Sequence, residues 1–140
     1  MNTVKSLLAG LTLLCAAVGA AQASDYYADF GGQDGMTLLV DKFVSHVLED
    51  KRIADYFATT KIPHLKQMLA LQFCEQLGGP CKYTGMDMRK AHSDLGVTDA
   101  AFNALAEDLI WALNEQHVPI AAQNALIAKL APMEHQVVTQ

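Results

Sequence analysis

Residues 78–97 read GGPCKYTGMDMRKAHSDLGV. The opening Gly-Gly-Pro ends any helix before it, because glycine takes left-handed backbone angles freely and proline cannot continue a helix. The run that follows predicts a short helix in which Met88, His92 and Leu95 share one face, at i, i+4 and i+7. His92 would then face an apolar space, either as a core histidine bonded to backbone carbonyls or as a ligand to a metal or haem iron.

The N-terminal residues 1–23 have the layout of a secretory signal peptide. Lys5 supplies a positive charge, residues 7–18 form an apolar run, and the Ala-Gln-Ala at 21–23 is a small-residue cleavage site. The apolar run is shorter than the roughly 20 residues that a transmembrane helix needs. We therefore expect a secreted protein, in a bacterial periplasm, whose folded domain spans residues 24–140 and has no membrane contact after cleavage.

The expected mature chain is mildly acidic. The full sequence of 140 residues has a formal net charge of −5, and loss of Lys5 with the leader makes it −6. This balance argues against nucleic acid or an anionic membrane as a partner. The remaining length suits one domain with a modest core.

Two cysteines remain after the leader, Cys74 and Cys81, with six residues between them. In an oxidising compartment they would form a disulfide, and the alternative is two free thiols with Cys74 packed in the core. The spacing does not resemble a structural zinc site, which uses four ligands in paired clusters. The sequence also shows no catalytic Ser-His-Asp or Cys-His set, carboxylate pair or phosphate-binding loop.

The hydrophobic pattern predicts an all-α domain of about five helices, since apolar residues recur every three to four positions and strict alternation is missing. A first long helix is expected from about Gly35, a second capped by Thr59 and Thr60, one capped by Thr98, and a last one opened by Pro119. Helices this short leave the centre of a helical sandwich unfilled. A flat apolar group in the middle would complete it.

Several short motifs follow one another in a fixed order along the chain. They are Gly31-Gly32, Phe57, Leu77-Gly78-Gly79-Pro80, Tyr83-Thr84-Gly85, Met88 shortly before Ala91-His92, and a Leu-Gly-Val turn leading to Phe102. In this order and at these spacings the chain resembles the truncated globins, specifically their first group, over nearly all of residues 27–135. The resemblance favours the ligand interpretation of His92.

The resemblance implies a two-over-two helical sandwich around haem b that binds oxygen, nitric oxide or carbon monoxide. His92 matches the proximal histidine that binds the haem iron, and Phe57 matches the aromatic that packs against the haem face. The other positions expected to line the haem are Leu65, Met68, Leu69, Tyr83, Met88, Val97 and Phe102.

The distal side departs from the family pattern. Val44 occupies the place of a tyrosine whose hydroxyl can bond to bound oxygen in many members, and Leu65 and Leu69 occupy places where glutamines are common. Met68 stands where certain members have a histidine that binds the iron as a sixth ligand; alternatively it fills space, as flexible core methionines do. The resemblance therefore implies a haem site without the usual means of stabilising bound oxygen.

Four functions are compatible with the sequence. We favour a globin that binds a diatomic gas. The alternatives are a periplasmic haem b electron carrier with His92 and Met68 as ligands and a redox partner protein, a nitric oxide dioxygenase or peroxidase, and a haem-free helical protein. The enzyme needs oxygen held long enough to react, and a missing distal hydrogen bond argues against it.

For the other basic side chains, the sequence gives only a weak indication of function. His64 is predicted about 100° around its helix from the pocket face, where it would be solvated or would contact a haem propionate. His46 is predicted at the surface. Arg89, Lys66 and Lys82 are candidates to pair with haem propionates, with a solvated face as the alternative for each.

Overall fold

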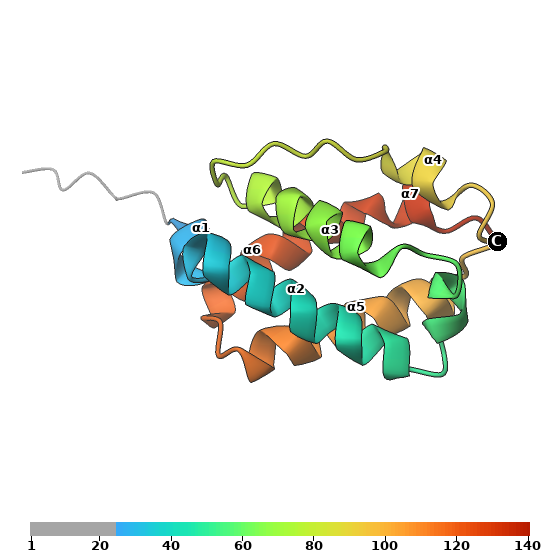
Figure 1. The fold of residues 1–140 in the computed structure, drawn as a ribbon, viewed down its shortest axis with the longest axis horizontal. Helices are drawn as coiled ribbons and strands as arrows, with labels where there is room; N and C mark the ends of the chain where they lie inside the picture. Colours follow the sequence, from blue (N-terminus) through green and yellow to red (C-terminus); the bar gives the residue numbers. More distant parts are fainter. Residues whose placement is uncertain (1–24) are drawn as a thin grey trace, which may run out of the picture.

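The computed structural model describes residues 25–140, so the predicted signal peptide lies outside the described residues. This part of the chain is helical and contains no strand, which confirms the all-α prediction (Figure 1). The α-helices and 3₁₀ helices (η) are α1 Tyr26–Asp29, α2 Gly32–Glu49, η1 Ala54–Phe57, α3 Ile62–Gln76, α4 Met88–His92, α5 Asp99–Glu115, α6 Ile120–Leu130, η2 Ala131–Met133 and α7 Glu134–Val137. None of the helices in residues 25–140 is both long and apolar enough to cross a membrane.

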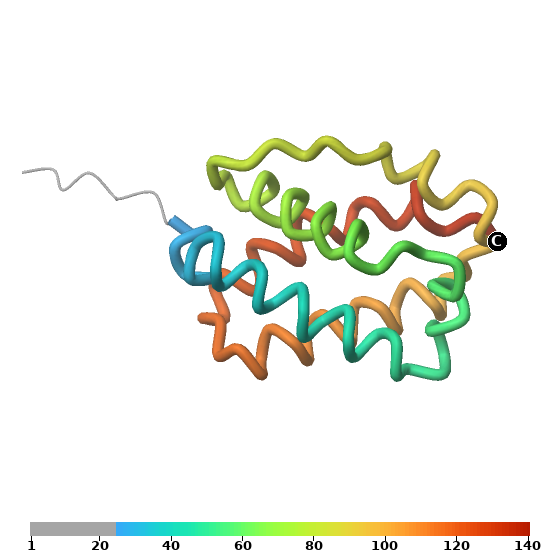
Figure 2. The backbone as a smooth tube through the Cα atoms, viewed as in Figure 1, coloured from blue at the N-terminus to red at the C-terminus, as the bar shows by residue number. Residues whose placement is uncertain are grey.

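The four long helices form two pairs. The chain reverses between α2 and α3 and again between α5 and α6, as the tube in Figure 2 shows. Helix α2 packs against both α3 and α5, and α3 packs against α6, so the two pairs stack on one another. This arrangement is the predicted two-over-two helical sandwich.

Helix α2 is central because one of its faces is apolar along its whole length. Met36, Leu39, Val40 and Val47 are fully buried and recur at helical spacing on that face. The helix begins three residues earlier than predicted. Gly35 permits this start, because a Cβ at that position would collide with the carbonyl of Phe30.

Of the two predicted helix caps by threonine, one is present in the structure. Thr98 caps α5 as predicted, since its hydroxyl accepts a hydrogen bond from the backbone N–H of Ala101 at 3.1 Å. The predicted cap of α3 by Thr59 and Thr60 is wrong: the N-cap is Lys61, without a side-chain bond.

The predicted number of about five helices is too low, because residues 25–140 form seven α-helices and two 3₁₀ helices. The additional elements are short. One of them, α1, precedes the first predicted helix and forms because the Asp25 carboxylate accepts from the Ala28 N–H at 3.1 Å and caps a single helical turn.

Cys74 and Cys81 form a disulfide, as predicted, with a Cα–Cα distance of 5.7 Å. Cys74 is buried near the end of α3, and Cys81 lies just beyond the Gly-Gly-Pro break. Gly78 has a positive φ of 76°, which lets the chain turn back towards the helix. The disulfide therefore holds the start of the long loop between α3 and α4 against the end of α3.

Candidate haem site

A cavity of about 660 Å³ lies among the helices, within the size range of cofactor pockets. Its lining is mostly apolar and comes from every long helix, from η1, and from the loop and short helices that follow α3. All nine residues that the sequence predicted around the haem line it: Phe57, Leu65, Met68, Leu69, Tyr83, Met88, His92, Val97 and Phe102. Segments far apart in the sequence therefore converge on one space.

His92 lines the cavity from the last residue of α4. Its Nδ1 lies 2.7 Å from the carbonyl oxygen of Met88. A carbonyl accepts only, so in the neutral ring Nδ1 carries the proton and Nε2 keeps a free lone pair. A metal ligand needs this state, with the other ring nitrogen fixed by a backbone carbonyl.

Helix α4 is shorter than predicted and ends at His92. Asp87 caps it, since its carboxylate accepts the backbone N–H of Lys90 at 3.0 Å. Leu95 therefore does not continue the helical face of Met88 and His92; it lies beyond the helix, 44% exposed, and still borders the cavity. The imidazole is presented by little more than one helical turn.

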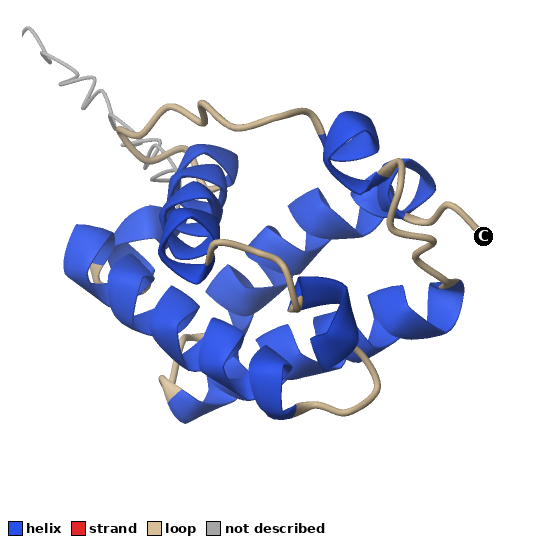
Figure 3. Cartoon of the chain, turned by 45° about the vertical axis from the view of Figure 1, so that its right-hand side comes forward, coloured by secondary structure: helices blue, strands red, loops and turns tan. Residues whose placement is uncertain are grey.

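The long loop after α3 crosses the molecule to reach α4 (Figures 1 and 3). Within it, Tyr83 lines the cavity and its hydroxyl donates to the carbonyl of Met86 at 2.7 Å. Gly85 leaves room for the Tyr83 side chain in this position, because a Cβ there would collide with the hydroxyl. Burial raises the pKa of Tyr83, and the carboxylate of Asp87 adds to this, so the hydroxyl remains a donor.

The distal residues are placed differently from the prediction at one position. Leu65, Met68 and Leu69 line the cavity from α3, as expected, but Val44 does not line it. Val44 is buried in the core, and the preceding residue, Phe43, faces the cavity instead. Consecutive helical residues differ by about 100° in direction, and the valine is too short to reach past the core.

Two polar lining residues, Gln72 and Lys61, were not predicted from the sequence. Gln72 lines the cavity from α3 although it is only 7% exposed. Lys61, the N-cap of α3, lies at the exposed edge of the cavity beside His64 in the first turn, so His64 is nearer the pocket than the predicted rotation implied. A polar residue among apolar neighbours in the sequence could have indicated Gln72, but not where its amide points.

The three cations proposed for haem propionates, Arg89, Lys66 and Lys82, do not line the cavity. Lys66 pairs with Asp41 at 3.0 Å and Lys82 with Glu75 at 2.9 Å, so carboxylates within the chain hold both. Spacing along the chain does not show which carboxylate lies beside a long side chain, so the sequence could not predict these two ion pairs.

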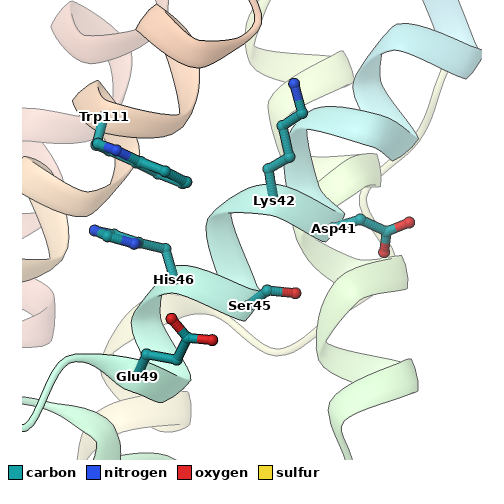
Figure 4. A pocket seen from close by; sticks show the side chains of 6 residues that line it. All are labelled: Asp41, Lys42, Ser45, His46, Glu49 and Trp111. Atoms are coloured by element: carbon teal, nitrogen blue, oxygen red, sulfur yellow. The ribbon is translucent and has the colours of Figure 1, made fainter.

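His46 is not simply at the surface, as predicted, but partly covered. Its ring stacks on Trp111 with centroids 3.8 Å apart, and its Nε2 lies 3.5 Å from the buried carboxylate of Asp108. Figure 4 shows the Trp111 and His46 rings face to face beside a shallow hollow between α2 and α5. This hollow is separate from the large cavity, and the two have no lining residue in common.

Several known proteins are similar to this chain in both sequence and fold. The family model of the bacterial-like globins matches residues 25–139. A group 1 truncated hemoglobin of a Synechocystis species is 36% identical over 127 residues, which cover 84% of this chain and 99% of that protein. The chain belongs to the group 1 truncated hemoglobins, within the bacterial-like globin family.

Solved structures of truncated hemoglobins superpose on this globin. The ferric truncated hemoglobin of Tetrahymena pyriformis has a TM-score of 0.78 at 27% identity and covers 82% of this chain and 98% of its own. The 2/2 hemoglobin of a Synechococcus species, solved in the cyanomet state with covalently attached haem, has a TM-score of 0.74 at 31% identity. That match covers 81% of this chain and 95% of the other.

Membership of this family means that the globin takes haem b as its cofactor and has a gas-binding role. The residues around the cavity fit such a group. The walls are apolar, as a porphyrin ring requires, and one imidazole offers a nitrogen with a free lone pair. Cationic and polar side chains gather at the exposed edge, where the carboxylates of a haem could remain in contact with water.

Proposed function

We propose that this globin binds a diatomic gas reversibly, oxygen above all, at a haem iron held by His92. The observation that carries the proposal is the bond between His92 Nδ1 and the Met88 carbonyl, which leaves Nε2 as the coordinating nitrogen inside the cavity. Haem b supplies the iron at which the gas binds. The protein supplies the fifth ligand, a dry space and the side chains that a gas meets there.

The apolar residues divide between two walls in this proposal. Met88, Val97 and Phe102, from the α4 side and α5, pack on the proximal side or the haem edge, together with Tyr83. Leu65, Met68 and Leu69 from α3 form the distal side, with Phe43 and Phe57 beside them. None of the side chains named for the distal side carries an N–H or O–H donor.

We infer that Lys61 and His64 hold the haem propionates. Both are exposed at the cavity edge, at the start of α3, and neither forms an ion pair within residues 25–140. A lysine ammonium offers three donors to a carboxylate while its stem covers apolar surface. This assignment replaces the three cations predicted from the sequence.

A second candidate function, a haem b electron carrier, rests on Met68. Its thioether lines the cavity from α3, whereas His92 comes from α4. Ligation by one histidine and one methionine raises the reduction potential of haem and suits electron transfer. A nitric oxide dioxygenase or peroxidase receives less support, because the α3 leucines offer no donor to hold oxygen during a reaction.

We also propose that the globin is exported to the periplasm. The leader pattern in residues 1–23 motivates this, and the Cys74–Cys81 disulfide supports it, because disulfides persist in oxidising compartments. The redox partner that an electron carrier would need must then also be periplasmic.

Absorption spectra of ferric, ferrous and carbon monoxide-bound protein test the assignment of ligands. Wild type should give a five-coordinate high-spin ferrous spectrum that is unchanged in Met68→Leu, while His92→Ala should lose stable haem binding and still fold. His135→Ala is the matched control, because His135 is exposed and does not line the cavity. His92→Ala with full haem content and a wild-type spectrum would contradict the proposal. A low-spin six-coordinate ferrous spectrum that is lost in Met68→Leu would establish the electron carrier instead.

A further inference from the structure

Gln72 is a polar side chain in a place where the cavity wall is otherwise apolar. Gln72 follows Leu65 by seven residues and Leu69 by three, so the three side chains share one face of α3. The Gln72 side chain is only 7% exposed. A carboxamide is costly to bury unless it is hydrogen-bonded, whereas a leucine of similar size would have no such cost. The partners of the amide therefore indicate what it does.

The amide nitrogen of Gln72 contacts two thioether sulfurs. Met88 Sδ lies 3.5 Å away and Met133 Sδ 3.7 Å away. Thioethers are weak acceptors, but a low local dielectric strengthens such contacts. Because Met88 begins α4 and Met133 ends η2, one side chain on α3 connects three segments.

The backbone of Met88 also supplies the hydrogen-bond acceptor that orients the His92 ring. The carbonyl oxygen of Met88 accepts the Nδ1 proton of His92 at 2.7 Å, and the two residues are the first and last of α4. Helix α4 has only five residues and packs mainly against α7. The Gln72–Met88 contact is thus a direct connection between the long helix α3 and the short helix that presents the imidazole.

We propose that Gln72 is a positioning residue for His92 and acts through Met88. By holding the Met88 side chain, it fixes the first turn of α4, and with it the carbonyl that sets the rotation of the imidazole ring and the direction of Nε2. This inference rests on the proposed function of His92. The amide hydrogens point to sulfurs on the α4 and η2 side, so the effect is expected on the proximal ligand and not on a gas on the distal side.

The test is a double-mutant cycle on the haem-loaded, full-length protein with Gln72→Met, Met88→Leu and the double variant. Gln72→Met keeps the length of the side chain and removes the donor, and Met88→Leu removes the acceptor. Gln67→Met is the matched control, an exposed glutamine on the same helix. The readouts are the iron–histidine stretching band of the ferrous protein, the carbon monoxide stretching band, and the rate of haem transfer to an apoglobin acceptor.

Gln72→Met and Met88→Leu should each shift or broaden the iron–histidine band and accelerate haem loss about threefold to tenfold, as expected for one lost hydrogen bond. The double variant should be no worse than either single variant, because both break the same contact. Gln67→Met should match wild type. Additive effects in the double variant, or an unshifted iron–histidine band in Gln72→Met, would overturn the inference. So would a shift confined to the carbon monoxide band. If the wild type showed no iron–histidine band at all, the proposed function itself would fail.

Discussion

His92 and His46 are both partly buried, yet their ring nitrogens have different surroundings. The Nδ1 of His92 donates to a backbone carbonyl, which leaves Nε2 in an apolar cavity. The Nε2 of His46 lies near the carboxylate of Asp108, and its ring is stacked on Trp111, which is 40% exposed. A histidine that can bind a metal keeps one ring nitrogen free while the other donates to a fixed acceptor, whereas the ring of a structural histidine is used for packing and ion pairing.

At the residue scale, the proposed apolar distal side predicts fast oxygen dissociation and a preference for carbon monoxide. Leu69→Gln should slow oxygen dissociation about tenfold to a hundredfold, because a hydrogen bond that involves charge contributes roughly 1.5–3 kcal/mol. Flash photolysis or stopped-flow mixing measures the rate. Leu71→Gln is the control, since Leu71 lies on α3 but does not line the cavity. A slow oxygen dissociation rate in wild type would refute the argument.

At the scale of elements, the short helix α4 depends on what surrounds it. Its own five residues are too few for a stable isolated helix, so caps, packing and the preceding loop must hold it. Asp87 supplies the cap, α7 supplies packing, and the Cys74–Cys81 disulfide holds the start of the loop that leads to α4. Val97, beyond α4, is held by the C-terminus, since its N–H donates to the Thr139 hydroxyl at 3.1 Å.

The disulfide is expected to form in the exported protein and to stabilise it. Protein from the periplasmic fraction should have an intact mass that begins at Ser24 and no thiol that can be alkylated before reduction. Cys81→Ser should lower the free energy of unfolding by about 2 kcal/mol in denaturant titrations, because a short loop is released in the unfolded chain.

The control for the disulfide variant is Lys82→Ala, next to Cys81. Lys82 is largely exposed, so loss of its ion pair with Glu75 should have little effect. Equal losses of stability in the two variants would assign the effect to local packing and not to the crosslink. Two alkylatable thiols in unreduced protein would contradict the disulfide itself.

At the scale of the whole molecule, a charge cluster joins the end of α2 to α5. Arg52 lies 2.8 Å from Asp50 and 2.6 Å from Glu107, and Asp108 is 3.9 Å from the same guanidinium. Hydrogen bonds to Asp50 and then to Glu107 raise the pKa of Arg52. Asp108 is the buried member, and its Oδ2 has no hydrogen-bond partner within residues 25–140.

The buried carboxyl group of Asp108 is expected to make the stability of the protein depend on pH. Burial raises its pKa above the ordinary 3.8, and the Asp50 carboxylate adds to this. As pH rises from about 4 through the raised pKa, the folded state loses a proton that the unfolded chain has already lost, so ionisation of this group lowers stability. Asp108→Asn should therefore gain stability relative to wild type as pH rises from about 4 through the raised pKa.

Urea unfolding of the haem-bound protein at several pH values measures this difference. Asp55→Asn, which removes an exposed carboxylate, should show no comparable trend. A stability difference between Asp108→Asn and wild type that is constant or shrinks with rising pH would contradict the assignment.

The sequence alone determined the features that depend on local spacing. Helical periodicity and the Thr98 cap predicted the all-α fold, and the order of motifs around His92 predicted the family and nine residues that line one cavity. Helical spacing shows which residues share a face, and a capping side chain acts within one turn, so both can be read without a structure. The roles of those nine residues towards haem remain predictions.

Only the tertiary structure decided which atoms meet across the fold. It placed Phe43 instead of Val44 on the cavity and Lys61 instead of Lys66 at its edge, and it brought Gln72 to Met88. These outcomes depend on how far each helix is rotated about its axis and how closely it packs on its neighbours. That rotation is set by contacts between residues distant in sequence, which the spacing of residues along one helix does not contain.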